Sequence, residues 1–281
     1  MILVTGATGT VGRLVARRLA GRAPLRLLTR EPRRLAGARA EVVGGDFTDP
    51  ASLERALTGV RSALLVTADP LTHAHDEQFV ERARRAGVRH VVKLSALAVS
   101  DPAATDLVTA WQRGNERILR DSGLAWTMLR PRAFMSNTLG WARSVRDEGV
   151  VRALGGSALN ATVDPRDIAE VAALALLHPE EHAGRAHHLT GPEPVSPAGQ
   201  TRTLAQLLRR PVRFVELSPD EARERLLAHR PAPVADALLQ SAARGRAGAK
   251  AHVDPTVERL LGRRPRSYRE WAADHLAAFG G

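Results

Sequence analysis

Apolar runs alternate with amphipathic stretches through the first half of the chain, and each change of period marks a change of element. The runs predict six short strands, at residues 2–4, 25–29, 41–46, 62–67, 90–95 and 126–130. Helical spacing predicts helices behind the first strand and at 52–57, 72–86 and 107–120. Each strand is apolar nearly throughout, which is typical of a parallel sheet covered by helices on both faces.

Three glycines follow the first strand at three-residue intervals: Gly6, Gly9 and Gly12. The first would allow a sharp turn, the second a close approach of backbone N–H groups to a pyrophosphate, and the third close packing of helix on strand. With Thr8, Thr10 and Val11 they form a predicted dinucleotide cradle, although the spacing is G-x-x-G-x-x-G and not the commoner G-x-G-x-x-G. Three glycines could also be a structural turn, but their place between strand and helix favours nucleotide binding.

The alternation of strands and helices loosens after Pro131. A turn at 163–168 opens a predicted helix to Leu177, residues 187–190 predict a late strand, and the tail is helical. Pro231–Pro233 predicts a loop and not a domain boundary.

We therefore expect an α/β fold, a Rossmann-type doubly wound parallel sheet with a smaller C-terminal substrate lobe. Residues 1–155 would form the NAD(P)-binding Rossmann domain. Residues 156–281 would add the remaining Rossmann elements and the substrate-binding lobe, all within one continuous structural unit.

The end of the second strand indicates which dinucleotide is preferred. An NAD site would place a carboxylate there to hold the ribose 2′-hydroxyl, whereas this chain has Arg30, followed by Arg33 and Arg34. A guanidinium binds a 2′-phosphate through two parallel hydrogen bonds, so we expect NADP(H), although arginine is common throughout this chain. Asp46 could accept a hydrogen bond from the adenine amino group, with Phe47 near the ring, or it could simply cap a turn.

Composition narrows the class of protein without naming a reaction. The chain has 281 residues, 44% of them hydrophobic, no cysteine and a net charge of +11. All basic residues except Lys93 and Lys250 are arginines scattered along predicted helices, so we expect no specific nucleic-acid binding. No apolar run is long enough for a membrane span and no secretory signal begins the chain, so we expect a cytoplasmic protein.

Seven segments carry a resemblance to a known family: Val4–Gly9, Leu28–Pro32, Gly45–Asp49, Ala86–Leu97, Ser122–Pro131, Asp164–Ala169 and Leu189–Glu193. In this order, over nearly the whole length, they resemble the NmrA-like group of atypical short-chain dehydrogenases/reductases. Members of that group include NADPH-dependent quinone and enone reductases, redox-sensing regulators and natural-product tailoring enzymes. The resemblance thus implies the fold and the cofactor and leaves the reaction open.

One feature of related enzymes is missing. They carry a Tyr-x-x-x-Lys pair on the helix after the fifth strand, and that helix usually continues to a glutamate, here Glu116. Counting back places Val108 at the tyrosine position and Gln112 at the lysine position, and the only tyrosine is Tyr268. Interconversion of alcohols and ketones by the usual route therefore lacks its acid.

Three loops should surround the nicotinamide, because they follow the C-terminal ends of neighbouring strands. The first runs from Thr67 and Ala68 to His73 and His75, and His73 could act as a general acid near neutral pH. Both histidines could equally be solvated residues of a first helical turn capped by Thr72. Their spacing would suit metal ligands, but no third ligand stands out, and we expect no metal.

The second loop begins at Ser95, whose hydroxyl could orient a substrate carbonyl or the nicotinamide amide; Lys93, on the same strand face, could be a buried charge. The third begins at Pro131, where Phe134 could cover the nicotinamide or an aromatic substrate and Asn137 could hydrogen-bond a carbonyl. Gln112 completes the catalytic candidates.

We therefore expect an NADP(H)-dependent oxidoreductase that transfers hydride to a quinone, an enone or an aromatic natural product. Its partner would be that small molecule, with a homodimer as one option for assembly. The composition, typical of a GC-rich genome, favours a role in secondary metabolism. A non-catalytic NADP(H) redox sensor and a redox-neutral tailoring enzyme remain as alternatives.

Overall fold

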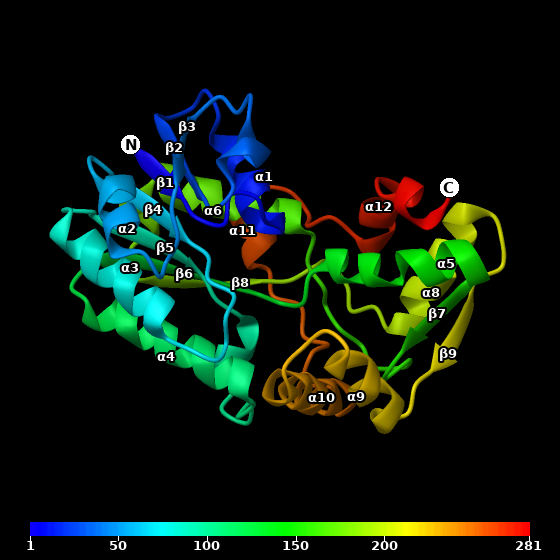
Figure 1. Cartoon of the computed structure of the whole chain (residues 1–281). Helices are drawn as coiled ribbons and strands as arrows, with labels where there is room; N and C mark the ends of the chain where they lie inside the picture. The colour runs from blue at the N-terminus through cyan, green and yellow to red at the C-terminus, as the bar shows by residue number, and fades with distance from the viewer. The chain divides into compact units, whose positions relative to one another are not determined.

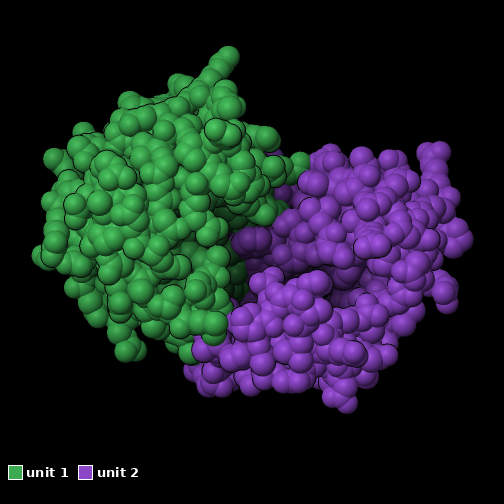
Figure 2. Space-filling view, viewed as in Figure 1, with its two compact units in different colours: residues 1–100, 109–131, 165–188 green, residues 101–108, 132–164, 189–281 purple.

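The computed structural model describes all 281 residues and divides the chain into two compact units (Figure 2). Unit 1 comprises residues 1–100, 109–131 and 165–188, coloured green. Unit 2 comprises residues 101–108, 132–164 and 189–281, coloured purple. The chain thus passes between the units several times, and the late Rossmann elements after residue 164 return to unit 1.

Unit 1 is built on a seven-stranded sheet of order β3-β2-β1-β4-β5-β6-β8 (Figure 1). Its strands are β1 (Ile2–Val4), β2 (Leu25–Thr29), β3 (Glu41–Gly44), β4 (Ser62–Leu65), β5 (His90–Leu94), β6 (Ala125–Pro131) and β8 (Arg185–Leu189). The pairs from β3 through β6 are all parallel. The order reverses between β1 and β4, the place where doubly wound sheets bind ligands at the carboxyl ends of their strands.

Helices cover this sheet in two layers. On one face α1 (Thr10–Leu19) packs against α6 (Pro165–Leu177), which also touches β4, β5 and β6. On the other, α2 (Pro50–Leu57), α3 (Ala74–Arg85) and α4 (Leu107–Asp121) share one apolar core through Leu53, Phe79 and Leu119. The Asp49 carboxylate begins α2 by accepting hydrogen bonds from the N–H groups of Ala51 and Ser52. The short helix α7 (Pro179–His182) also belongs to unit 1.

Unit 2 contains a small parallel sheet of β7 (Val150–Ala153) and β9 (Arg213–Glu216). Its helices are α5 (Ala142–Glu148), α8 (Pro197–Leu208), α9 (Pro219–Leu227), α10 (Ala232–Arg246), α11 (Thr256–Leu261) and α12 (Tyr268–Ala273). Short 3-10 helices lie at Pro32–Leu35 and Leu97–Ser100 in unit 1, and at Met135–Trp141 and Leu276–Phe279 in unit 2. Tyr268, Trp271 and Phe279 are the largest side chains of its core.

The structure confirms the predicted α/β fold, and the six predicted strands lie close to their expected positions. The predicted loop at Pro231–Pro233 is wrong, because Pro231 is the N-cap of α10 and the helix begins at Ala232. Thr72 is likewise not the N-cap of α3, whose N-cap is His73. No helix of the structure has both the length and the apolar composition that crossing a membrane requires.

A buried histidine links β5 to its neighbours. His90 Nε2 lies 2.8 Å from Thr127 Oγ1, and that hydroxyl donates to the carbonyl of His182, so the imidazole must be the donor of the pair. His90 Nδ1 is buried without a hydrogen-bond partner. Burial, and next the nearby His182, lower the pKa of His90 to about 4. The folded protein therefore holds this ring neutral.

Because the unfolded chain binds a proton at His90 below about pH 6.5, acid should destabilise the folded state. Between pH 7.5 and 5 the free energy of unfolding should fall by about 2 kcal/mol on account of this one side chain. Urea denaturation at both pH values would measure the fall, with His90→Gln as the non-titrating comparison. Equal falls in both proteins would contradict a neutral buried His90.

Candidate functional site

The turn after β1 forms a cradle of backbone groups. Gly6 has φ +59°, and Gly9 N–H donates to the Gly6 carbonyl over 2.9 Å. Gly9 is the N-cap of α1 and offers no side-chain cap, so the first N–H groups of the helix keep no capping partner. A Cβ on Gly12 would lie 2.2 Å from the Gly6 oxygen, which only glycine avoids. These features fit a dinucleotide pyrophosphate held at a helix N-terminus.

The other predicted cofactor residues of unit 1 follow the same edge of the sheet. Arg30 follows β2, Asp46 follows β3, Thr67 and Ala68 follow β4, Ser95 follows β5 and Pro131 ends β6. Since parallel strands bring their carboxyl ends to one edge, the structure gathers these positions near the cradle. Thr8 is half-buried, Thr10 is exposed, and Val11 is buried in the first turn of α1.

Arg30 and Asp46 lie together at this edge. The Arg30 side chain is 82% exposed, and its Nε is 3.8 Å from Asp46 Oδ2. The backbone and hydroxyl of Thr48 donate to Asp46 Oδ1 at 2.8 and 2.7 Å, and these bonds, more than the charge of Arg30, lower the pKa of Asp46. Asp46 thus caps a turn with one oxygen. The Arg30 guanidinium makes no close hydrogen bond and can receive a 2′-phosphate.

Phe47 packs between unit 1 side chains. Its ring stacks on His75 with 5.5 Å between centroids and meets the edge of Phe79 at 6.2 Å. This arrangement fixes His75 as a partner of Phe47. It also leaves Phe47 half-buried beside Asp46.

A buried ion pair supports the loop after β4. Lys93 is fully buried and its Nζ lies 2.7 Å from Asp76 Oδ1, confirming the buried charge expected at this strand position. Thr67 Oγ1 accepts from Lys93 at 2.7 Å and donates to Asp76 at 2.7 Å. The Thr67 hydroxyl is therefore committed to the protein, and the Lys93 ammonium also lies 5.7 Å from the centre of the Trp111 ring.

A second buried network supports Ser95. Its hydroxyl donates to Glu116 Oε1 at 2.6 Å, while Arg130 binds both oxygens of Glu116 at 2.9 and 2.6 Å. Burial opposes the ionised form of Glu116, but hydrogen bonds from Arg130 and Ser95 and the charge of Arg120 lower its pKa overall. Because the Ser95 hydroxyl donates its hydrogen bond to Glu116, it can accept a hydrogen bond from a carboxamide N–H₂ but cannot donate one to a substrate carbonyl.

His73 is held by α4. Its Nδ1 lies 2.6 Å from Asn115 Oδ1, so the ring donates there and keeps Nε2 for another partner. A Cβ on Gly114 would lie 2.4 Å from His73 Cε1, which shows how closely the ring packs on the helix. Gln112, at the lysine position of the missing dyad, is buried, and its Oε1 has no hydrogen-bond partner. The sequence marks His73 and Gln112 as candidates, whereas no motif marks Gly114 and Asn115, which hold the His73 ring in place.

The remaining candidates, Phe134 and Asn137, belong to unit 2, where Phe134 is the half-buried N-cap of the 3-10 helix at Met135–Trp141 and Asn137 is exposed. Tyr268 lies in the core of the same unit, 2% exposed, with its hydroxyl 3.3 Å from Thr138 Oγ1. Burial raises its pKa well above the usual range, so the only tyrosine of the chain is no proton donor.

Replacing Gly12 with alanine tests the cradle. The new Cβ would be forced against the Gly6 carbonyl, so α1 must shift, and we expect at least a tenfold loss of NADPH affinity together with a lower Tm. Fluorescence titration with NADPH and thermal denaturation would measure both. Gly140→Ala is the matched control, because a Cβ there meets nothing within 4 Å. Unchanged NADPH affinity in the Gly12 variant would remove the cradle from the site.

Replacing Arg30 with alanine tests cofactor choice. NADPH binding should weaken by roughly ten- to a hundredfold, because the 2′-phosphate loses a charge-assisted pair, while NADH binding stays within about twofold. Arg39→Ala, which removes another exposed arginine of unit 1, should affect neither cofactor. An equal loss of affinity for NADPH and NADH would exclude Arg30 from this role.

The sequence of this chain is similar to those of known NAD(P)H-binding proteins. The family model described as "NAD(P)H-binding" matches residues 6–179. Over 99% of both chains the sequence is 54% identical to the (4-alkanoyl-5-oxo-2,5-dihydrofuran-3-yl)methyl phosphate reductase of Streptomyces griseus. It is 33% identical to the NAD(P)H azoreductase of Xenophilus azovorans, over all of this chain and 99% of the relative.

A solved structure shows the same fold over the whole length. The NADPH-dependent quinone oxidoreductase QOR2 of Escherichia coli superposes with a TM-score of 0.85 and 25% identity, covering 99% of this chain and 100% of the other. The family match, together with the fold shared with an NmrA variant at a TM-score of 0.76 and 17% identity over 98% of this chain, bears out the resemblance to NmrA-like proteins at the level of the fold. The chain therefore belongs to the NAD(P)H-binding family, as one of its NAD(P)H-dependent reductases.

Proposed function

We propose that this protein uses NADPH to reduce the ring double bond of a (4-alkanoyl-5-oxo-2,5-dihydrofuran-3-yl)methyl phosphate, a butenolide phosphate. The observation that carries the proposal is the 54% identity to the Streptomyces griseus reductase of that name, which extends over 99% of each chain. NADPH is the proposed reductant because exposed Arg30 follows β2 and because the similar quinone oxidoreductase is NADPH-dependent.

The chemistry of this substrate class agrees with the missing Tyr-x-x-x-Lys pair. In such a molecule the ring double bond is conjugated with both the lactone carbonyl and the alkanoyl carbonyl. NADPH, when bound, supplies a hydride for the ring carbon that bears the phosphomethyl group. The electron pair of the double bond then becomes an enolate shared by two carbonyls, and one proton from water completes the saturated product. Such a stabilised anion needs no strong acid from the protein.

The residues of unit 1 supply binding and orientation. The N–H groups at Gly9 and the start of α1 would hold the pyrophosphate, and Arg30 the 2′-phosphate. Ser95, whose hydroxyl already donates to Glu116, would accept from the nicotinamide carboxamide. The buried pairs beneath, Lys93 with Asp76 and Arg130 with Glu116, keep the loops that carry these groups in one conformation.

NADPH oxidation, followed by nicotinamide absorbance, tests this function directly. We expect saturable oxidation with the butenolide phosphate and a kcat/KM at least tenfold above that for simple quinones and enones. Reduction of the ring double bond should appear in the product by mass and NMR. The Gly12→Ala variant serves as the enzyme control, since its cradle is disrupted.

Two other outcomes would contradict the proposal in different ways. Efficient turnover of quinones alone would replace the butenolide by another acceptor class. NADPH binding without oxidation across all acceptors would instead indicate a sensor or a redox-neutral enzyme on the same fold.

A further inference from the structure

Two cations of unit 2, Lys250 and Arg132, have no carboxylate within ion-pair distance, although Asp101 and Asp106 attract them from farther away. Lys250 lies between α10 and α11, and its Nζ donates to Ser241 Oγ of α10 at 2.8 Å, with no acidic side chain within ion-pair distance. Arg132 follows β6 directly; it is half-buried, and its buried Nε has no hydrogen-bond partner. Partly buried cations are normally paired with a carboxylate, so two neighbouring cations without such an ion pair indicate a place for an anion.

The charges around these two side chains add to a positive excess. Arg244 is the third cation, and it is paired with Asp106 at 2.7 Å and lies 4.0 Å from Asp101. Lys250 and Arg132 therefore repel each other with only the two carboxylates of Arg244 nearby. Burial, then Arg132 and Arg244, lower the pKa of Lys250 to about 8 against the opposing pull of Asp106. Burial lowers the pKa of Arg132 against the opposing pull of Asp101, and Arg244 adds to the lowering.

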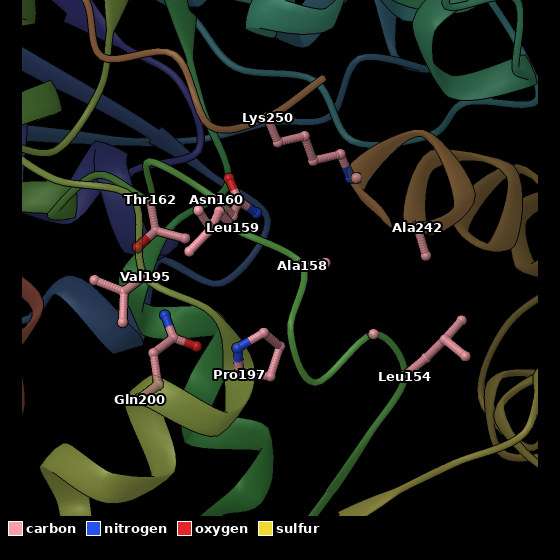
Figure 3. Close-up of a pocket in the computed structure, with 12 residues that line it drawn as sticks. Leu154, Ala158, Leu159, Asn160, Thr162, Val195, Pro197, Gln200, Ala242 and Lys250 are labelled. Carbon is pink, nitrogen blue, oxygen red and sulfur yellow. The ribbon is translucent and has the colours of Figure 1, made fainter. Parts of the chain in front are cut away.

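A cavity of about 180 Å³ lies beside Lys250 in the same unit (Figure 3). Figure 3 shows the Lys250 side chain extending toward α10, with Asn160 and Gln200 among the polar lining residues. Asn160 Oδ1 is buried without a partner, so it can accept a hydrogen bond from a donor that enters the cavity. Leu154, Leu159 and Ala242 give the cavity an apolar wall.

This combination fits a phosphate ester better than a free phosphate ion. A cation pair offers charge and hydrogen-bond donors to phosphate oxygens, with Arg132 able to bind two of them at once. Inorganic phosphate has no apolar surface to contact the apolar wall, whereas a hydrocarbon chain could pack against it. In the proposed substrate, the phosphomethyl and alkanoyl groups are borne by neighbouring ring carbons, so one site with a cationic end and an apolar wall can take both.

We propose that Lys250 and Arg132 form the binding site for the phosphate monoester of the substrate, with the apolar wall of the adjoining cavity receiving its alkanoyl chain. The assignment rests on the proposed function for the identity of the ester. The site itself stands on the two unpaired cations and the cavity beside them. Arg244 would contribute long-range attraction and is held by its own carboxylates.

Binding of hexyl phosphate to the full-length protein, saturated with NADP⁺ so that the cofactor site is filled, tests the site without turnover. Calorimetry should show that the wild type binds hexyl phosphate. The Lys250→Met and Arg132→Met variants should bind it at least tenfold more weakly. Arg230→Met, which removes an exposed cation of the same unit, is the matched control and should bind like the wild type. Arg132→Lys provides a conservative variant should the methionine variant not fold.

The pH dependence of hexyl phosphate binding adds a signature that a structural role would not produce. A bound phosphate dianion favours the protonated amine, so affinity must fall once Lys250 loses its proton above about pH 8. The wild type should bind about tenfold more weakly at pH 9 than at pH 7. Lys250→Met should show no such fall. A wild type and variant with the same pH profile would overturn the assignment of Lys250.

Kinetics connect the site with the reaction. The wild type should reduce the butenolide phosphate at least tenfold more efficiently, as kcat/KM, than the same butenolide with a free hydroxymethyl group. In Lys250→Met and Arg132→Met this ratio should approach one, whereas Arg230→Met should keep it. A wild type that reduces both compounds equally well would overturn the phosphate site and leave the reductase function standing.

The remaining outcomes are also distinguishable. If hexyl phosphate binds through Lys250 but neither butenolide is reduced, the site stands and the proposed substrate fails. If inorganic phosphate binds as tightly as hexyl phosphate with the same dependence on Lys250, the ligand is the free ion and the ester assignment is wrong. Hexyl phosphate affinity that is equal in all variants would refute the proposal outright.

Discussion

The close approach of the Gly12 backbone to the Gly6 carbonyl is the constraint that determines the shape of the predicted cofactor site. Because a Cβ there would lie 2.2 Å from the Gly6 oxygen, α1 can begin directly over the end of β1 only with glycine at this position. That approach aims the uncapped N–H groups of α1 at the carboxyl ends of β1 and β4, the neighbouring strands between which the strand order reverses. Because α1 packs against α6, the position of α1 over β1 also determines how these two helices cover the sheet.

Behind that edge, the polar side chains mostly serve one another. Lys93, Asp76 and Thr67 close a buried triangle, and Glu116 collects hydrogen bonds from Ser95 and Arg130. Because these groups make their hydrogen bonds to one another, they hold the loops in place and are not available as proton donors to a substrate. The arrangement suits a reaction in which the cofactor brings the reactive electrons and the protein has mainly to orient the partners.

Local patterns predicted the parts of the fold that local physics determines. The apolar runs located β1 through β6, and the glycine spacing located the cradle, because burial and turn geometry act within a few residues. The pairing of β7 with β9 escaped prediction, since it joins distant segments of only four residues each. His73 meets Asn115 only through tertiary structure, which also brings Arg132 near enough to Lys250 for their charges to interact. The charges were visible in the sequence, but their lack of partners was not.

The chain contains only two lysines, and Lys93 is fully buried. Acylating reagents attack neutral amines, and with a pKa of about 8 roughly a quarter of Lys250 is neutral at pH 7.5, against about one in a thousand for an ordinary lysine. Arginine side chains do not react in this way, since they stay protonated. Amine-directed dyes and cross-linkers will therefore find a single lysine to modify, with the α-amino group of Met1 as the other reactive amine. The arginine-rich composition thus confines side-chain labelling by such reagents to one position.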